Sequence, residues 1–416
     1  MNEANENITP ERKFGQFPWK FRESILISAG LLLSGFIIEL LSGGKGFSMP
    51  GWPSNILILL LFIAYIVAFH LLVKHPLKKW LSSTYAAISA VGVFALLLLL
   101  MGIIPQNNVN ADSFLTKSGL DHITRSWPFL LCSFNLLLVL SLTIIRRLWP
   151  FSLKNAAFIL NHFGLWIVIV AASLGATDSI KLNMVLQENK TVFIASDDQG
   201  RTFDVNIGLK LLKFSMDEYP PELGLINASD GSLKIPAKNL LTVKKGNKGM
   251  MGGWIVGIEN YIENAYQDSA GFVPTASYGS APAVFINVSH KDSGKTYTGW
   301  VSSGSPYIYP QVLDLQNGEA IAMTVSKPRR FVSLVRAYST MNESRDFVVE
   351  VNKPAKYKGW TVYQAGYDQQ MGKWSRRSVL QLVRDPWLPV VYTGIFMIMA
   401  GALYLLWCGR PKRTTE

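Results

Sequence analysis

Six long apolar stretches limit the possible folds of this chain more than any other feature of its sequence. Each stretch is close to the ~20 residues that a helix needs to cross the hydrocarbon core of a membrane. The 416 residues are 49% hydrophobic and only 16% charged, a composition typical of membrane proteins. No small-residue cleavage site follows the first stretch, so we expect a retained anchor. The predicted spans are residues 24–42, 54–73, 85–104, 128–145, 157–176 and 388–408.

The positions of lysine and arginine predict how these spans are oriented. Cytoplasmic loops of membrane proteins carry an excess of both residues. Basic residues follow the second, fourth and sixth spans, so these ends and both chain termini are expected in the cytoplasm. Residues 177–386 are then extracytoplasmic. The basic residues are Lys74, Lys78 and Lys79, then Arg146, Arg147 and Lys154, and finally Arg410, Lys412 and Arg413.

Residues 178–385 show a different pattern, in which apolar and polar residues alternate in short runs. Examples are TVFIASDD, APAVFINVSH and KGWTVYQAGYD, which are rich in β-branched and aromatic residues and lie next to turn-forming residues. A segment of about 200 residues is long enough to bury its own core. We therefore expect a multi-pass α-helical membrane protein with six spans. A large, predominantly β extracytoplasmic domain, a sandwich or barrel-like body, would lie between spans five and six.

The sequence lacks the motifs of several common classes of function. Cys132 and Cys408 both fall inside predicted spans, so the chain has neither a CxxC redox motif nor a disulfide in the outer domain. It contains no GxSxG, HExxH or Walker A motif. The net charge of +12 partly reflects the cytoplasmic flanks, and no nucleic-acid-binding motif is present. His290, the histidine of the outer domain, lies beside a turn and is expected to be solvated.

Two histidines lie inside predicted spans, where an ionisable side chain is costly and often functional. His70 lies close to the end of the second span, and His162 lies just after the start of the fifth. In the predicted orientation both imidazoles are roughly 6–8 Å inside the cytoplasmic boundary. Neutral imidazole is a common ligand of haem iron, but it also forms hydrogen bonds between helices or leans toward headgroups. His75 is expected at the interface, and His122 in an external loop.

The end of the sequence resembles a known family. Residues 349–368 read VEVNKPAKYKGWTVYQAGYD, and residues 385–407 read DPWLPVVYTGIFMIMAGALYLLW and hold the last span. Both resemble the ResB family, also called CcsB, of cytochrome c biogenesis proteins. QENKT at 187–191 departs from the family's EGET motif, which leaves the role of that strand open. The other similar segments are GIIPQ (102–106), HFGLWIVIVAASLGA (162–176), NMVLQENKTVF (183–193) and GLKLLKFSMDEYP (208–220).

The resemblance also implies a division of the chain. The family's membrane segments correspond to spans three to six. Residues 1–84 would then hold a tail and two additional spans, and residues 85–177 would hold three spans of the ResB-like core. Residues 178–385 would form the extracytoplasmic domain, and residues 386–416 the final span with a cytoplasmic tail.

The resemblance implies a role in System II cytochrome c maturation in the bacterial plasma membrane. Members of this family act with a CcsA/ResC-type partner, handle haem b and serve its attachment to apocytochrome c. The family's haem ligand at the start of its third span corresponds to His162, which would bind the haem iron, whereas nothing transfers to His70. The partner's WWD signature is absent here, because no tryptophan of this chain is followed by aspartate. The implied protein is a non-catalytic subunit of a haem-attachment complex.

Two other interpretations remain open. The first is a membrane-anchored extracytoplasmic binding or sensing module without haem chemistry, in which His162 only forms a hydrogen bond between helices. The second is a transporter subunit, for which internal repeats or broken helices would be expected, and no convincing repeat is present. Within the haem interpretation, His70 is a second candidate ligand because it shares its depth with His162. That idea requires the second and fifth spans to lie on the same side of the bundle.

Overall fold

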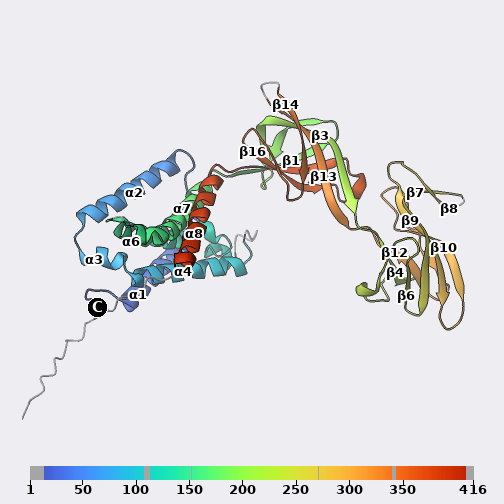
Figure 1. The fold of residues 1–416 in the computed structure, drawn as a ribbon, viewed down its shortest axis with the longest axis horizontal. Helices are drawn as coiled ribbons and strands as arrows, with labels where there is room; N and C mark the ends of the chain where they lie inside the picture. Colours follow the sequence, from blue (N-terminus) through green and yellow to red (C-terminus); the bar gives the residue numbers. More distant parts are fainter. Residues whose placement is uncertain (1–13, 107–112, 151, 270, 340–342, 409–416) are drawn as a thin grey trace, which may run out of the picture. The chain divides into compact units, whose positions relative to one another are not determined.

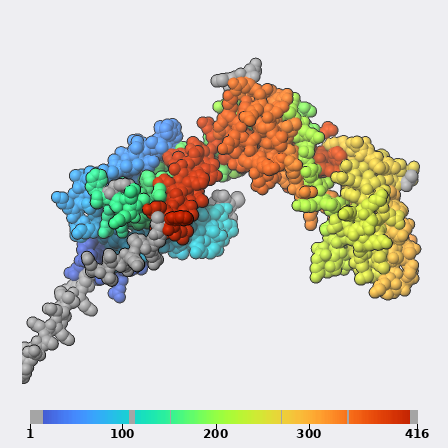
Figure 2. Space-filling model, in the orientation of Figure 1, coloured from blue at the N-terminus to red at the C-terminus, as the bar shows by residue number. Residues whose placement is uncertain are grey.

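The computed structural model describes residues 14–106, 113–150, 152–269, 271–339 and 343–408. Two compact units are present: one holds the chain up to Ile180 and from Asp385 onward, and the other holds Lys181–Arg384. The first unit is helical and the second is built from strands (Figure 1). Figure 2 shows the red C-terminal helix packed with blue and green N-terminal segments, so residues from both ends of the chain complete one unit.

Within the described ranges, six helices are long and apolar enough to cross a membrane. Each apolar stretch of the sequence forms one of them. Helix α6 continues past its predicted end through Arg146 and Arg147, because cations are favourable in the last turn of a helix. The six are α1 (Phe21–Leu41), α2 (Ser54–Leu72), α4 (Thr84–Ile103), α6 (Trp127–Leu148), α7 (Ala156–Gly175) and α8 (Leu388–Cys408); short helices α3 (Pro76–Leu81), α5 (Phe114–Lys117), η1 (Ile123–Arg125) and η2 (Leu153–Asn155) connect them.

Helix α6 is the centre of the bundle and packs against α1, α4 and α7. In the most apolar 18 residues of α6, 56% of the residues are buried. The corresponding share in α2 is 11%, because α2 lies at the edge of the bundle. Helices α7 and α8 approach most closely at Gly164 and Gly394. A Cβ atom at Gly164 would lie only 2.6 Å from the Gly394 carbonyl oxygen, so this contact requires glycine.

Eight antiparallel strands of the second unit form one curled sheet in the order β14-β13-β3-β2-β1-β17-β16-β15. Strand β14 also contacts β15 and β16, and the sheet surrounds one core that includes Met184, Leu209 and Val362. The segment QENKT is the turn between β1 and β2, where Asn189 has a φ of 64°. The strands are β1 (Ile180–Gln187), β2 (Thr191–Ser196), β3 (Thr202–Glu218), β13 (Pro328–Ser339), β14 (Ser344–Glu350), β15 (Ala355–Tyr357), β16 (Trp360–Tyr367) and β17 (Arg377–Arg384).

Residues 219–327 are inserted between β3 and β13 and form a two-sheet sandwich. One sheet has the order β10-β9-β7-β6, with β8 paired to β7, and the other has the order β11-β12-β4-β5. Val256, Ile286 and Ile321 belong to the core that both sheets share. The predicted strand-rich domain is confirmed, and it contains both a curled sheet and a sandwich. The strands are β4 (Glu222–Asn227), β5 (Leu241–Thr242), β6 (Lys248–Met251), β7 (Trp254–Asp268), β8 (Gly271–Pro274), β9 (Ala281–His290), β10 (Thr296–Ser302), β11 (Leu313–Asp314) and β12 (Glu319–Met323).

One carboxylate links the two sheets of the sandwich. Glu319, on β12, accepts hydrogen bonds from the Lys234 ammonium at 2.8 Å, from Trp254 Nε1 at 2.8 Å and from Asn317. The bond from Lys234 is the main reason that the pKa of Glu319 falls to about 2, and it outweighs the opposing effect of burial. Because Trp254 belongs to β7 of the other sheet, this ionised group connects both layers.

Candidate functional site

His162 lies in the second turn of α7 and is half-buried. Its Nδ1 atom is 2.9 Å from the carbonyl oxygen of Phe158, one turn earlier. The imidazole also stacks on the Phe158 ring, with 3.7 Å between ring centroids, and the Arg147 guanidinium lies 5.3 Å from the centroid of the same ring. A carbonyl accepts only, so Nδ1 is the donor in this bond, and in a neutral imidazole the lone pair would then be on Nε2. Histidines that bind metals are commonly oriented by such a bond.

His70 lies in the last turn of α2, on a helix that faces α7. Its carbonyl oxygen accepts a hydrogen bond from the Lys78 ammonium at 2.7 Å. One turn before His70, Ile66 lines a cavity of about 260 Å³ whose opposite wall includes Trp166, one turn after His162. The two histidine-bearing helices therefore lie on the same side of the bundle and flank one cavity. Neither histidine lines this cavity, so a ligand role for His70 stays a prediction.

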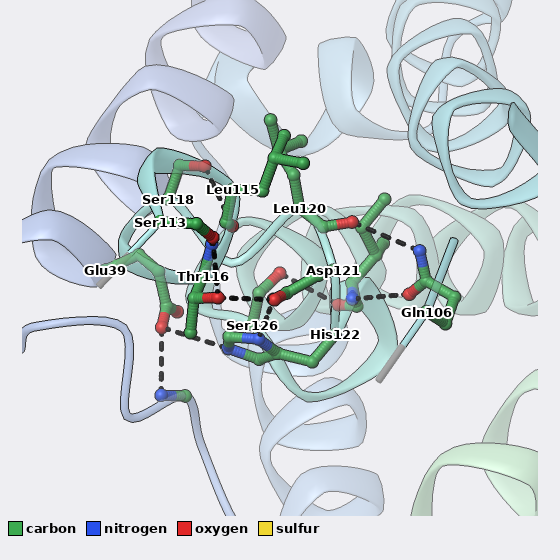
Figure 3. Close-up of polar contacts among 12 residues, drawn as sticks. Glu39, Gln106, Ser113, Leu115, Thr116, Ser118, Leu120, Asp121, His122 and Ser126 are labelled. Carbon is green, nitrogen blue, oxygen red and sulfur yellow. Dashed lines mark hydrogen bonds and ion pairs between the residues drawn. The ribbon is translucent and has the colours of Figure 1, made fainter. Parts of the chain in front are cut away.

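His122 has a carboxylate near each ring nitrogen (Figure 3). Its Nδ1 atom is 2.6 Å from Asp121 Oδ1, and its Nε2 atom is 3.5 Å from Glu39 Oε1. Nε2 is buried and has no hydrogen-bond partner in the described part of the chain. Both carboxylates are almost completely buried, at 0% exposure for Glu39 and 2% for Asp121. These three residues, the Glu39–Asp121–His122 cluster, face one another inside the helical unit.

The Glu39–Asp121–His122 cluster joins the end of α1 to the start of α6. The two carboxylate oxygens of Glu39 accept from the backbone nitrogens of Gly46 at 2.8 Å and Trp127 at 2.7 Å. Trp127 is the first residue of α6, so the carboxylate also interacts favourably with the positive end of the helix dipole. Asp121 Oδ2 accepts from the Thr116 hydroxyl at 2.5 Å. The arrangement stabilises the helix ends, and among the described residues His122 Nε2 stays buried without a hydrogen bond.

Removing the Glu39 carboxylate is expected to destabilise the helical unit. Glu39→Ala leaves the half-buried Gly46 and Trp127 N–H groups without their carboxylate acceptor, which costs about 1–3 kcal/mol for each N–H that water does not reach. Thermal unfolding of the detergent-purified protein should show a clearly lower midpoint. Glu259→Ala, which removes an exposed carboxylate of β7, is the matched control and should leave the midpoint unchanged. Equal midpoints for both variants would show that the cluster adds nothing to stability.

A second polar contact joins three helix ends. Asp178, just after α7, accepts hydrogen bonds from the Asn55 side chain at 2.6 Å, from Trp387 Nε1 at 2.7 Å and from the Trp52 backbone nitrogen at 2.8 Å. Partial burial acts to raise the pKa of Asp178, but these three bonds together lower it. Asn55 is the second residue of α2, and Trp387 directly precedes α8. The Asp178 carboxylate therefore connects the end of α7 to the starts of α2 and α8.

The remaining histidines have local structural contacts. His75 Nδ1 accepts from the Leu77 backbone nitrogen at the start of α3. His290 Nδ1 accepts from the backbone nitrogens of Asp292 and Ser293 in the turn after β9. Cys132 is a buried free thiol in α6. Among the described residues, no group of three or more His, Cys, Asp or Glu side chains is arranged to hold a metal ion.

Comparison with known proteins supports the resemblance in one part of the chain. A family model described as the ResB-like family matches residues 319–377, from β12 through the first residue of β17. This segment is ResB-like. It includes the strands β14, β15 and β16, which carry the VEVNKPAKYKGWTVYQAGYD sequence, so the ResB resemblance of this region is confirmed. The ResB-like segment lies wholly in the strand-rich unit and contains neither His70 nor His162.

Two further comparisons add little. No curated protein matches the chain. A solved structure of the cytochrome c heme lyase CcmF aligns with 94% of this chain and 46% of its own, at 11% identity and a TM-score of 0.23. The chain thus spans less than half of that protein. A score this low does not establish a shared fold.

Proposed function

We propose that this protein is a haem-handling subunit of a System II cytochrome c maturation complex. The observation that carries the proposal is His162, an imidazole with a free Nε2 lone pair inside an apolar helix of a chain with a ResB-like segment. Neutral imidazole with its other nitrogen hydrogen-bonded is the form that binds haem iron. In this proposal haem b is cargo that the chain holds and passes on, and apocytochrome c receives it.

The six apolar helices would cross the bacterial plasma membrane, with both termini in the cytoplasm and residues 177–386 outside. Two contacts support a chain that crosses the membrane in alternating directions. Glu39 joins the end of α1 to the start of α6, and Asp178 joins the end of α7 to the starts of α2 and α8, so these ends would lie on one side. Residues 1–84 would add two spans to a core formed by 85–177 and 386–416. The strand-rich domain, residues 178–385, would contact the partner or apocytochrome c.

The second axial ligand would come from a CcsA/ResC-type partner with a WWD motif, as the family resemblance implies. His70 is the alternative within this chain, since α2 and α7 line one cavity. Thioether formation needs a reduced cysteine of apocytochrome c and a haem vinyl group, and we assign no catalytic residue for it to this chain. The protein would be a non-catalytic subunit of the complex.

Deleting the gene in its source bacterium tests the proposal. Covalently bound haem in c-type cytochromes, measured by haem staining of denaturing gels, should fall to background, because attachment needs haem delivered to the outer face. The b-type cytochromes, which are not attached covalently, serve as the control and should be retained. Normal levels of c-type cytochromes in the deletion strain would contradict the proposal and favour a binding or sensing module instead.

A further inference from the structure

A second, larger cavity lies between α2, α6 and α7, toward the starts of α2 and α6 and the end of α7. Its volume is about 700 Å³, which is within the range of small-molecule sites. Most of its wall is apolar and aromatic. The residues that define this surface, the α2–α6–α7 groove, include Phe62, Tyr65, Phe129, Phe134, Leu137 and Val170.

Polar residues gather at one end of the groove. Thr124, Arg125 and Ser126 line it just before α6, and Thr177 lines it just after α7. Arg125 is exposed, and no carboxylate in the described ranges forms an ion pair with its guanidinium. A guanidinium without a counter-ion beside an apolar groove is complementary to a molecule with an anionic head and an apolar body.

The groove is open at its side, because α2 packs loosely against the bundle. Tyr65 on α2 is 50% exposed and Phe134 on α6 is 48% exposed, and both line the groove. In an apolar helical unit such an opening faces the hydrocarbon of the membrane. A molecule entering it would come from the lipid phase rather than from water.

We propose that the α2–α6–α7 groove binds one anionic phospholipid. Its acyl chain would lie between α2 and the α6–α7 pair, and its phosphate would contact the Arg125 guanidinium, which offers paired donors that fit phosphate oxygens. The Thr124 hydroxyl supplies a further donor at the same end, whereas the Thr177 hydroxyl donates to the Pro50 carbonyl oxygen. The bound lipid would fill the space between α2 and the α6–α7 pair. It would therefore also hold α2 against the bundle. The orientation of the helices given under the proposed function would place this lipid in the outer leaflet. The rest of the proposal does not depend on that orientation.

Native mass spectrometry of the full chain released from nanodiscs tests the inference. The probes are phosphatidylglycerol, which carries a net negative charge, and phosphatidylcholine, which does not. The wild-type protein should retain one phosphatidylglycerol molecule in preference to phosphatidylcholine. Arg125→Gln should lower the retained phosphatidylglycerol at least fivefold. Lys45→Gln removes a charge from the α1–α2 loop, which contacts the Arg125 backbone through Phe47, but Lys45 does not line the groove, so this variant should retain as much as wild type.

A second variant tests the apolar part of the groove. Ala172 on α7 is exposed and lines the groove, so Ala172→Trp fills it and should reduce retention of both lipids. Equal phosphatidylglycerol retention by wild type and Arg125→Gln would overturn the inference. A dimer with a second copy seated on α2 in place of lipid would also overturn it. Haem content, measured in the same preparations, should not follow lipid retention, so failure of this inference and failure of the proposed haem role are distinguishable.

Discussion

Replacing His162 with alanine is expected to lower the haem content of the purified complex about tenfold or more, because an axial ligand is lost. The measurement is the low-spin haem spectrum of this chain co-expressed with its CcsA/ResC-type partner. Phe158 already holds Nδ1 of His162, so Nε2 is the atom available to iron. Added imidazole should restore part of the spectrum by entering the vacated space, a recovery that a purely structural role of His162 would not give.

His290→Ala is the matched control, since it removes an imidazole from a turn of the strand-rich unit and should leave the spectrum unchanged. His70→Ala in the chain purified without a partner separates the two sources of the second ligand. If the lone wild-type chain shows a low-spin spectrum that disappears in His70→Ala, both axial ligands come from this chain. If the low-spin spectrum appears only when the CcsA/ResC-type partner is co-expressed, the second ligand comes from the partner. Wild-type haem content in His162→Ala would contradict the ligand assignment.

Replacing Gly164 with valine is expected to destabilise the helical unit by about 3 kcal/mol, since the added atoms meet backbone that cannot move aside. A Cβ at this position would lie 2.6 Å from the Gly394 carbonyl oxygen and 3.0 Å from the Ile398 backbone nitrogen. Because 1 kcal/mol corresponds to roughly 2–4 °C in a unit of this size, the unfolding midpoint should fall by about 6–12 °C. The measurement is loss of the monodisperse chromatography peak after heating.

Gly92→Val is the control for the Gly164 variant. Gly92 is an exposed glycine inside α4, and a Cβ built there meets nothing within 4 Å. The two variants make the same substitution in the interior of an apolar helix and differ only in the packing around it. If both lose the same stability, the effect comes from helix propensity, and close packing of α7 on α8 is not what holds α8 in the bundle.

The helices and strands were predictable because each depends on a local pattern. An apolar run of about 20 residues forms a helix whatever its neighbours are, since every backbone group in such a run must find its partner within the run itself. The alternating segments APAVFINVSH and KGWTVYQAGYD likewise became β9 and β16. Their pairing was not predictable. The order β14-β13-β3-β2-β1-β17-β16-β15 brings together strands distant in the sequence, and period-two alternation carries no information about the partner strand.

The candidate sites divide in the same way. His70 and His162 stand out in the sequence, because an imidazole in an apolar span is costly. The Glu39–Asp121–His122 cluster was not predicted from the sequence, although Glu39 in the apolar segment GFIIELL was a usable signal of the same kind. Nothing near Glu39 in the sequence points to Asp121 and His122, which lie in the loop before α6.

The sequence by itself determined the six apolar helices, the strand-rich domain between the fifth and sixth, and the two histidines inside apolar helices. These features depend on burial of apolar residues at helical or strand spacing, which local composition encodes. Only the tertiary structure decided that α2 and α7 flank one cavity, that Phe158 orients His162, and that Arg125 ends an open groove. Such features arise where side chains from separate helices meet, and contacts between distant segments leave no pattern in a single sequence.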